Sequence, residues 1–215
     1  MGKIRNHCTI VSGAPNDNIN FLKENIDTNS FIIAADCGYI KLQKADIKPD
    51  LIIGDFDSAR RPDIDCEIMT FPVEKAYSDT FNCVVEAIDR GYNTIDIFFA
   101  IGGNRFDHTY SNLLILEYCR QRNVSCRLID DNNRLSLIIG KRTIKKEYRY
   151  FSLFAYLCNC HGVTIEGAYY DQSFYNLDSM DMMAYDNFAQ SNRIIGTECT
   201  ICVEDGVLLL VESND

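Results

Sequence analysis

The sequence lacks the features that mark export, membrane insertion or binding to nucleic acid. No run of 18 apolar residues occurs in its 215 residues, and the segment from Met1 to His7 has no apolar signal core. Lys and Arg number 21 against 31 Asp and Glu, which gives a formal net charge of −10. Nucleic acid and anionic membranes both require basic patches, so we expect neither as a partner and expect a cytoplasmic protein.

Two further absences narrow the class of protein. The sequence has no Gly-x-x-x-x-Gly-Lys-Ser/Thr loop, which disfavours a P-loop kinase. Its ten cysteines are scattered through apolar runs, unlike those of small disulfide-rich domains, so we expect most to be small core residues. A metal site formed by Cys158, Cys160, Cys199 and Cys202 is the alternative. Strand geometry disfavours it, because positions 199 and 202 would face opposite sides.

The first 131 residues alternate short apolar strands with helical segments, which is typical of a parallel sheet flanked by helices. We expect strands at 7–12, 31–35, 51–53, 67–71, 96–101 and 126–129. We expect helices from about residue 19, at 39–44, between Ser78 and Gly91, and at 109–121. This pattern predicts a Rossmann-like α/β domain over residues 1–131.

The pattern of apolar and polar residues changes after residue 131. Short segments rich in Ile, Tyr, Phe, Thr and Val follow at brief intervals, and no strongly amphipathic helix interrupts them. They cover residues 135–139, 150–157, 163–165, 197–203 and 207–211. Such a pattern indicates an antiparallel sandwich or barrel, so we predict a second, β-sandwich domain over residues 132–215.

The most informative stretch runs from Pro49 to Ser58 and ends an apolar strand in Gly54 and two carboxylates, Asp55 and Asp57. Open α/β sheets bind ligands outside the carboxyl ends of their strands. In extended geometry an i, i+2 pair points to one side, and paired carboxylates are hard oxygen ligands of the kind that Mg²⁺ prefers. The alternative is a solvated loop with a turn-forming Asp-Ser.

Three other segments carry candidate residues. Asp79 falls in the first turn of the helix capped by Ser78, where the helix dipole alone would favour a carboxylate. Gly102 and Gly103 separate a strand from a helix, and with Arg105 they indicate a phosphate cradle. His108 follows closely and is either a base or a hydrogen-bonding group.

Taken together, these motifs closely resemble those of the thiamine pyrophosphokinase family. Four segments occur in the family's order and spacing: Asp36 after the second strand, Gly54-Asp-Phe-Asp-Ser58, Lys75-Ala-Tyr-Ser-Asp79, and Gly102-Gly-Asn-Arg-Phe-Asp-His108. Later segments also resemble the family's β-rich, thiamine-binding half, namely 162–167, Ser191-Asn192 and 205–211. The resemblance implies a homodimer that transfers the pyrophosphoryl group of ATP to the thiamine hydroxyl, giving thiamine diphosphate and AMP.

The resemblance also implies roles for particular residues. Mg²⁺ would be held by Asp55, Asp57 and Asp79. The nucleotide and its transferring phosphates would be contacted by Asp36, Ser58, Lys75, Arg105 and Asp107, and thiamine by Ser191 and Asn192. Asp107 is a candidate for orienting or deprotonating the hydroxyl. The sequence departs from the family at Ala76, where an acidic residue is usual, and at Cys37, where glycine is common.

The residues leave two other classes of function open. A phosphatase with Asp55 as nucleophile would share the strand followed by Asp-x-Asp, but it would leave Asp79, Arg105 and Asp107 unexplained. A non-catalytic nucleotide sensor would bind Mg-ATP without turnover. Phosphoryl-group transfer accounts for more of these residues, because it requires metals, cations on phosphate oxygens and a carboxylate near the attacking hydroxyl.

Overall fold

The computed structural model describes residues 6–16, 18–55, 64–72, 76–187 and 189–215. Contacts between residues divide the chain into two compact units, an N-terminal unit of residues 1–131 and a C-terminal unit of residues 132–215. Each unit has its own secondary structure and its own core. The catalytic and thiamine-binding roles predicted for the two parts stay predictions.

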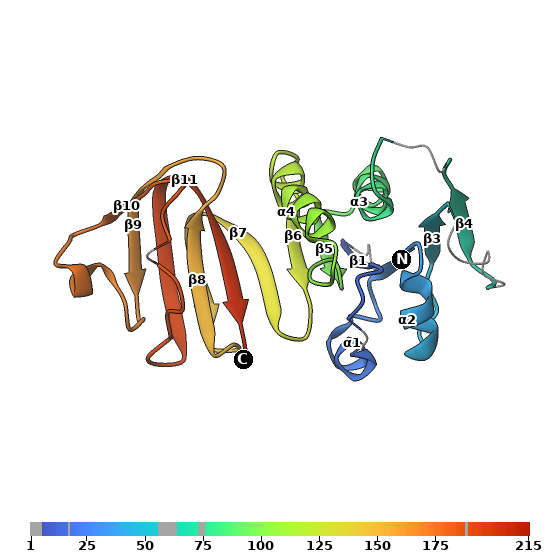
Figure 1. The fold of residues 1–215 in the computed structure, drawn as a ribbon, viewed down its shortest axis with the longest axis horizontal. Coiled ribbons are helices and arrows are strands. Elements are labelled where there is room, and N and C mark those ends of the chain that lie inside the picture. Colours follow the sequence, from blue (N-terminus) through green and yellow to red (C-terminus); the bar gives the residue numbers. More distant parts are fainter. Residues whose placement is uncertain (1–5, 17, 56–63, 73–75, 188) are drawn as a thin grey trace. The chain divides into compact units, whose positions relative to one another are not determined.

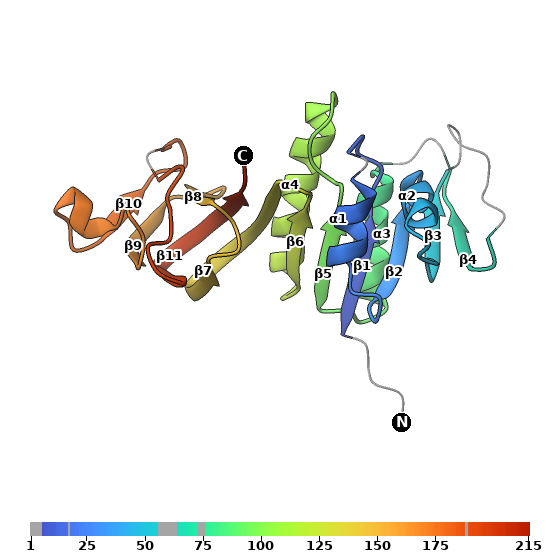
Figure 2. The same ribbon diagram turned by 90° about the horizontal axis from the view of Figure 1, so that it is seen from below.

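A parallel sheet forms the centre of the N-terminal unit, in the order β6-β5-β1-β2-β3-β4 (Figure 2). Its strands are β1 His7–Val11, β2 Phe31–Ala35, β3 Leu51–Gly54, β4 Glu67–Thr70, β5 Thr94–Phe98 and β6 Ser125–Ile129. The predicted parallel α/β arrangement is therefore confirmed.

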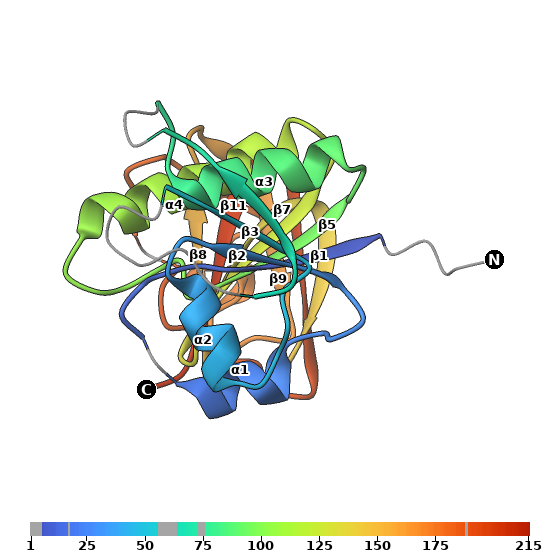
Figure 3. The same cartoon turned by 90° about the vertical axis from the view of Figure 1, so that its right-hand side faces the viewer.

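Helices cover both faces of this sheet. They are α1 Ile19–Asn25, α2 Gly38–Lys44, α3 Asp79–Asp89 and α4 Phe106–Arg120. Figures 1 and 3 show α1 and α2 on one face and α3 and α4 on the other. Because both faces are covered, the apolar run Leu51–Ile53 of β3 is fully buried, as its lack of polar alternation predicts.

Helix α3 begins and ends where its sequence indicates, whereas α4 begins earlier than expected. The Ser78 hydroxyl accepts a hydrogen bond of 3.2 Å from the Phe81 amide, so Ser78 is the predicted N-cap of α3. Helix α4 starts at Phe106 and not at Thr109. Its N-cap is Arg105, which makes no side-chain capping bond, so the sequence carries no capping signal at this position.

Strand β5 ends at Phe98, three residues before the predicted end at Ile101. The cause is Phe99, which adopts a left-handed backbone conformation with φ of 55°. Its amide still donates to the Ile129 carbonyl at 2.9 Å, and its carbonyl accepts from the Ala14 amide at 3.0 Å. The chain therefore leaves the strand ladder at Phe99 while remaining fixed to the edge of the sheet.

All named strand pairs of the C-terminal unit are antiparallel, which confirms the predicted strand direction. The elements are β7 Asn133–Lys145, β8 Tyr150–Ala155, β9 Cys160–Glu166, the 3₁₀ helix η1 Gln172–Tyr175, β10 Met180–Met182 and β11 Glu198–Ser213. Strand β11 pairs with β7, β8 and β9, and β10 pairs with β9. The packing of these strands as a sandwich stays a prediction.

Residues 198–213 form one long strand, β11, and not two strands at 197–203 and 207–211 as predicted. A register shift between Val203 and Leu208 takes up the polar residues in between, where Gly206 has a φ of 104°. Within β11, Cys199 is buried and Cys202 is partly exposed, as expected for opposite faces.

All ten cysteines are free thiols. Across the described part of the chain, no group of three or more His, Cys, Asp and Glu side chains is close enough to hold a metal ion. Nor does any described helix combine the length and apolar character that crossing a membrane requires.

Candidate active site

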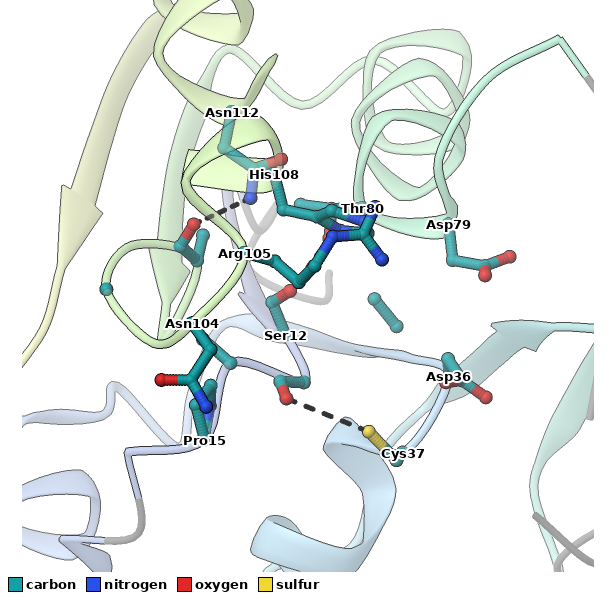
Figure 4. A pocket seen from close by; sticks show the side chains of 15 residues that line it. Ser12, Pro15, Asp36, Cys37, Asp79, Thr80, Asn104, Arg105, His108 and Asn112 are labelled. Atoms are coloured by element: carbon teal, nitrogen blue, oxygen red, sulfur yellow. Dashed lines mark hydrogen bonds between the residues drawn. The ribbon is translucent and has the colours of Figure 1, made fainter. Parts of the chain in front are cut away.

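A pocket of about 360 Å³ lies at the carboxyl ends of the central parallel strands. Strand β1 stands between β2 and β5, so the chain continues to one side after β1 and returns on the other side with β5. Parallel sheets open a crevice at such a point, and ligands of this fold class bind there. The pocket is lined by residues 12–15, 35–37, 79–80, 100, 102, 104–105, 108 and 112 (Figure 4).

Asp36 enters this pocket directly after β2. Its backbone is left-handed, with φ of 46°, and its amide donates to the Ile53 carbonyl at 2.7 Å. The neighbouring Gly54 allows this approach, because a Cβ atom there would lie 3.1 Å from the Asp36 Cα. The Asp36 Oδ1 is buried without a hydrogen-bond partner among the described residues. A strained backbone and an unsatisfied acceptor are typical of a binding site.

The three carboxylates assigned to Mg²⁺ are described only in part. Asp79 is the first residue of α3 and lines the pocket. Asp55 directly follows β3, is partly buried and does not line the pocket. Asp57 lies outside the described residues, as do Ser58 and Lys75. Carboxylate oxygens suit a hard divalent cation, so the chemistry of the described donors is compatible with Mg²⁺.

Arg105 and Asp107 form a bidentate ion pair at the start of α4. The guanidinium donates from Nε to Oδ1 at 2.9 Å and from a terminal nitrogen to Oδ2 at 2.6 Å. This contact with Arg105 lowers the pKa of Asp107 to about 2. A carboxylate with so low a pKa is a weak proton acceptor near neutral pH. The geometry therefore favours Asp107 as the group that orients Arg105 over Asp107 as a base.

We expect the effects of Arg105→Gln and Asp107→Asn on kcat/KM to be strongly non-additive, because each change breaks the same pair. Either change should lower kcat/KM about 10-fold, and the double variant should be little worse than Arg105→Gln. Steady-state rates of the four proteins test this. Since the pair is exposed, thermal unfolding should be nearly unchanged. Effects that multiply, or an acid limb that disappears from the pH–rate profile of Asp107→Asn, would contradict this role.

The loop between β5 and α4 uses part of its hydrogen-bonding capacity internally. The Gly102 amide donates to the Thr109 hydroxyl at 3.1 Å, so this amide is not offered to an anion as the glycine pair suggests. Arg105, Asn104 and His108 still line the pocket. An anion at this wall would therefore depend mainly on Arg105, which extends over the pocket in Figure 4.

Three pocket residues with polar side chains lie outside the motifs predicted from the sequence. Ser12 and Thr80 are buried and share a hydrogen bond of 2.7 Å, and the buried Asn112 amide donates to the Ala100 carbonyl at 2.6 Å. Ser12 directly follows an apolar strand, which is the signal that identified Asp36 and Asp55. Thr80 and Asn112 lie inside helices, and the sequence carries no comparable signal for them.

The predicted thiamine residues lie in the C-terminal unit, next to one another. Asn192 is 2% exposed, and both ends of its amide are used: it donates to the Tyr170 carbonyl at 2.6 Å and accepts from the Tyr170 and Arg193 amides. Ser191 is exposed and has a left-handed backbone, with φ of 53°. Asn192 therefore positions the segment that carries Tyr170, and Ser191 is the residue with a free surface.

The comparisons with known proteins agree on one family. The family model of the thiamin pyrophosphokinase catalytic domain matches residues 22–128. The chain belongs to the thiamin pyrophosphokinase family. The thiamine pyrophosphokinase of Bacillus subtilis is 28% identical over 215 residues, which cover 96% of this chain and 98% of that protein. This relative therefore extends the similarity beyond residues 22–128 into the C-terminal unit.

Solved structures of thiamin pyrophosphokinases share the fold. The Bacillus subtilis enzyme superposes with a TM-score of 0.87 at 25% identity, covering 97% of this chain and 99% of that chain. The Geobacillus thermodenitrificans enzyme gives 0.83 at 24% identity, with coverage of 97% and 98%. The family model and the Bacillus subtilis relative do not favour the phosphatase or sensor alternatives.

The two departures from the family motifs differ in their surroundings. Ala76 is exposed and lies just before α3. Cys37 lines the pocket, and its sulfur lies 3.9 Å from the Gly13 carbonyl. Burial raises the pKa of the Cys37 thiol, so it remains protonated and adds a neutral, weakly polar group to the pocket wall.

Proposed function

We propose that the protein is a thiamine pyrophosphokinase that transfers the pyrophosphoryl group of ATP to the hydroxyl of thiamine. The oxygen of the hydroxyl bonds to the β-phosphorus, the bond between that phosphorus and the oxygen bridging it to the α-phosphorus breaks, and AMP leaves. The hydroxyl proton passes to solvent or to a carboxylate of the site. The products are thiamine diphosphate and AMP.

One observation carries this proposal. Asp36, Asp79 and Arg105 come from three separate family motifs, spread over 70 residues of sequence, and all three line the same pocket. The pocket lies where ligands of parallel α/β sheets bind. Its volume of about 360 Å³ falls in the range of small-molecule sites.

The residues of the N-terminal unit have complementary roles in this proposal. Arg105, held by Asp107, neutralises charge on phosphate oxygens, as does Lys75. Asp36 and Ser58 contact the nucleotide. Asp55, Asp57 and Asp79 hold Mg²⁺, which when bound offsets the negative charge of the phosphates. Three carboxylates from two segments would otherwise repel one another.

Thiamine is placed in the C-terminal unit by this proposal. Ser191 contacts it directly, and Asn192 fixes the neighbouring Tyr170 through three hydrogen bonds with the main chain of residues 170 and 193. Exposed aromatic rings follow along this segment, so a flat ring system would find stacking partners.

The bond of ATP that breaks distinguishes this function from a simple kinase. Incubation with thiamine and Mg-ATP, followed by separation of the nucleotides, should show AMP appearing in step with thiamine diphosphate. A kinase that transfers only the γ-phosphoryl group would release ADP and form thiamine monophosphate. Either that result or the absence of thiamine-dependent turnover would overturn the proposal. Trapping of an aspartyl phosphate on Asp55 would favour the phosphatase alternative.

We expect the protein to be a homodimer formed through its C-terminal unit, since a unit of 84 residues has a limited core of its own. Tyr169 and Phe174 are exposed there, and Tyr170 joins them in edge-to-face contacts with ring centroids 4.9 Å apart. The candidate aromatic residues for this interface are Tyr169, Tyr170, Phe174 and Phe188, of which Phe188 lies outside the described residues. Light scattering at micromolar concentration should give twice the chain mass of 24.5 kDa. A monomeric mass with full activity would contradict this arrangement.

A further inference from the structure

The pocket contains a buried pair of hydroxyl groups outside the four motif segments of the sequence. Ser12 follows β1 and Thr80 lies in the first turn of α3. Both line the pocket, they are only 6% and 7% exposed, and their side-chain oxygens lie 2.7 Å apart. Figure 4 shows the two side chains within the pocket.

One hydrogen-bond donor of this hydroxyl pair is not used by the part of the chain that the structure describes. Two hydroxyls carry two hydrogens, and only one is used in the bond between them. Within the described residues neither hydroxyl has another hydrogen-bond partner, so the second hydrogen has no acceptor. A buried donor without an acceptor is unfavourable. The pair therefore presents one unused donor to the pocket.

A second hydroxyl pair, between Thr9 on β1 and Ser30 just before β2, shows the complete arrangement. Thr9 and Ser30 lie 2.6 Å apart and are fully buried, away from the pocket. There the Ser30 hydroxyl donates to the Asp27 carbonyl at 2.6 Å, so both hydrogens are used within the protein. The difference between the pairs indicates that the acceptor missing at Ser12 and Thr80 belongs to a ligand.

The surroundings indicate an anionic acceptor. Thr80 lies at the N-terminal end of an 11-residue helix, where unpaired amides and the helix dipole favour negative charge. Arg105 lines the same pocket, and Asp107 binds only two of its three guanidinium nitrogens, so the third can still donate to an anion. The buried Oδ1 of Asp36 requires a hydrogen-bond donor, which a phosphate oxygen cannot supply. Asp36 would therefore not lie against a phosphate group.

We infer that Ser12 and Thr80 act as one hydrogen-bond donor to a phosphoryl oxygen of the nucleotide. The inference rests on the proposed function, because ATP is its ligand. It adds two binding residues to the pocket that the sequence motifs do not contain.

The test measures binding of Mg-ATP without thiamine, by titration calorimetry. Thr80→Val keeps the shape of the side chain and removes its hydroxyl, and we expect the dissociation constant to rise about 10-fold. Ser12→Ala leaves the Thr80 hydrogen available to the ligand, so its effect should be smaller, and the double variant should lose at least as much affinity as Thr80→Val. Thr80→Ser retains the hydroxyl and should bind within about 3-fold of the unchanged protein. Thr9→Val is the matched control, because it removes one hydroxyl of a buried pair outside the pocket and should leave the affinity unchanged.

Adenosine separates a phosphate contact from a contact with the sugar or base. It lacks phosphates, so its affinity should be the same for Thr80→Val and the unchanged protein. A loss of adenosine affinity equal to that of ATP would overturn the assignment to a phosphoryl oxygen. Equal ATP affinity of the unchanged protein, Thr80→Val and Ser12→Ala would overturn the whole inference and leave the proposed function standing. No binding of Mg-ATP by the unchanged protein would overturn both.

Discussion

Replacing Asp79 by asparagine is expected to lower kcat about 100-fold or more while leaving the protein folded. Asp79 lines the pocket at the first position of α3, and in the proposed function it shares Mg²⁺ with Asp55 and Asp57. Asparagine keeps the size of the side chain but removes the charge that holds the cation. The rate should therefore become more dependent on Mg²⁺ concentration. The measurement is kcat against Mg²⁺ concentration for Asp79→Asn, Asp55→Asn and Asp57→Asn.

A matched control exists at the other end of the same helix. Asp89 is exposed at the last position of α3, far along the helix from the pocket, so Asp89→Asn should keep both rate and metal dependence. Thermal unfolding of Asp79→Asn should shift little, since a first-turn carboxylate contributes only about 0.3–1 kcal/mol through the helix dipole. Near-normal turnover and metal dependence in Asp79→Asn, Asp55→Asn and Asp57→Asn would remove the metal assignment.

The sequence predicts elements well where one local cause determines them. The apolar run of β3 and the Ser78 cap of α3 are such cases, and both lie where expected. The end of β5 is different, because Phe99 leaves the strand through contacts with Ala14 and Ile129, which are distant in sequence. No local pattern around Phe99 contains that information. The extent of β11 could not be predicted for a related reason. The polar residues between Val203 and Leu208 interrupt the apolar pattern of the sequence, but in the structure they form a bulge within one continuous strand.

The residues of the site likewise divide into those that a local sequence pattern predicts and those that only tertiary contacts determine. Asp36 and Asp79 were found because each lies at the end of a strand or the start of a helix, and the structure brings both to one pocket. The pairing of Ser12 with Thr80 spans 68 residues, and the use of the Asn192 amide by Tyr170 spans 22. Such pairings depend on tertiary contacts. The segments that form the site could be predicted from the sequence. The hydrogen-bond partners of their polar atoms could be determined only from the fold.

Replacing Asp96 by asparagine is expected to destabilise the N-terminal unit by about 3 kcal/mol at pH 6. The Asp96 side chain on β5 is 6% exposed and accepts two short hydrogen bonds from Arg127 on β6, at 2.6 and 2.5 Å. It also contacts the His7 ring on β1 at 3.0 Å. Arg127 is 36% exposed, so water can still solvate its charge after the change. The loss of unfolding free energy should therefore lie at the lower end of the range for a broken buried ion pair.

The effect of this change should depend on pH through His7. Hydrogen bonding to Asp96, opposed by burial and helped by Asp27, raises the pKa of His7 above its ordinary value of 6.5. This contribution to stability is complete below pH 6.5 and is lost as pH rises through the folded-state pKa. Burial alone would raise the pKa of Asp96, but His7 and Arg127 outweigh it and lower the pKa below 3.8. The stability from Asp96 is therefore present above pH 3.8 and is lost as pH falls through its folded-state pKa.

The free energy of unfolding, followed by far-ultraviolet circular dichroism in urea, should thus differ most between the two proteins at about pH 4–6.5. The gap should narrow toward pH 9, because deprotonated His7 no longer benefits from Asp96, while the contribution from Arg127 persists. Asp65→Asn is the control, since among the described residues Asp65 pairs only with Lys48, at an exposed site, and the change should alter stability by less than about 0.5 kcal/mol. If Asp96→Asn lost no more stability than this control, or if the gap widened above pH 7, the His7–Asp96–Arg127 network would not be a determinant of stability in the parallel sheet.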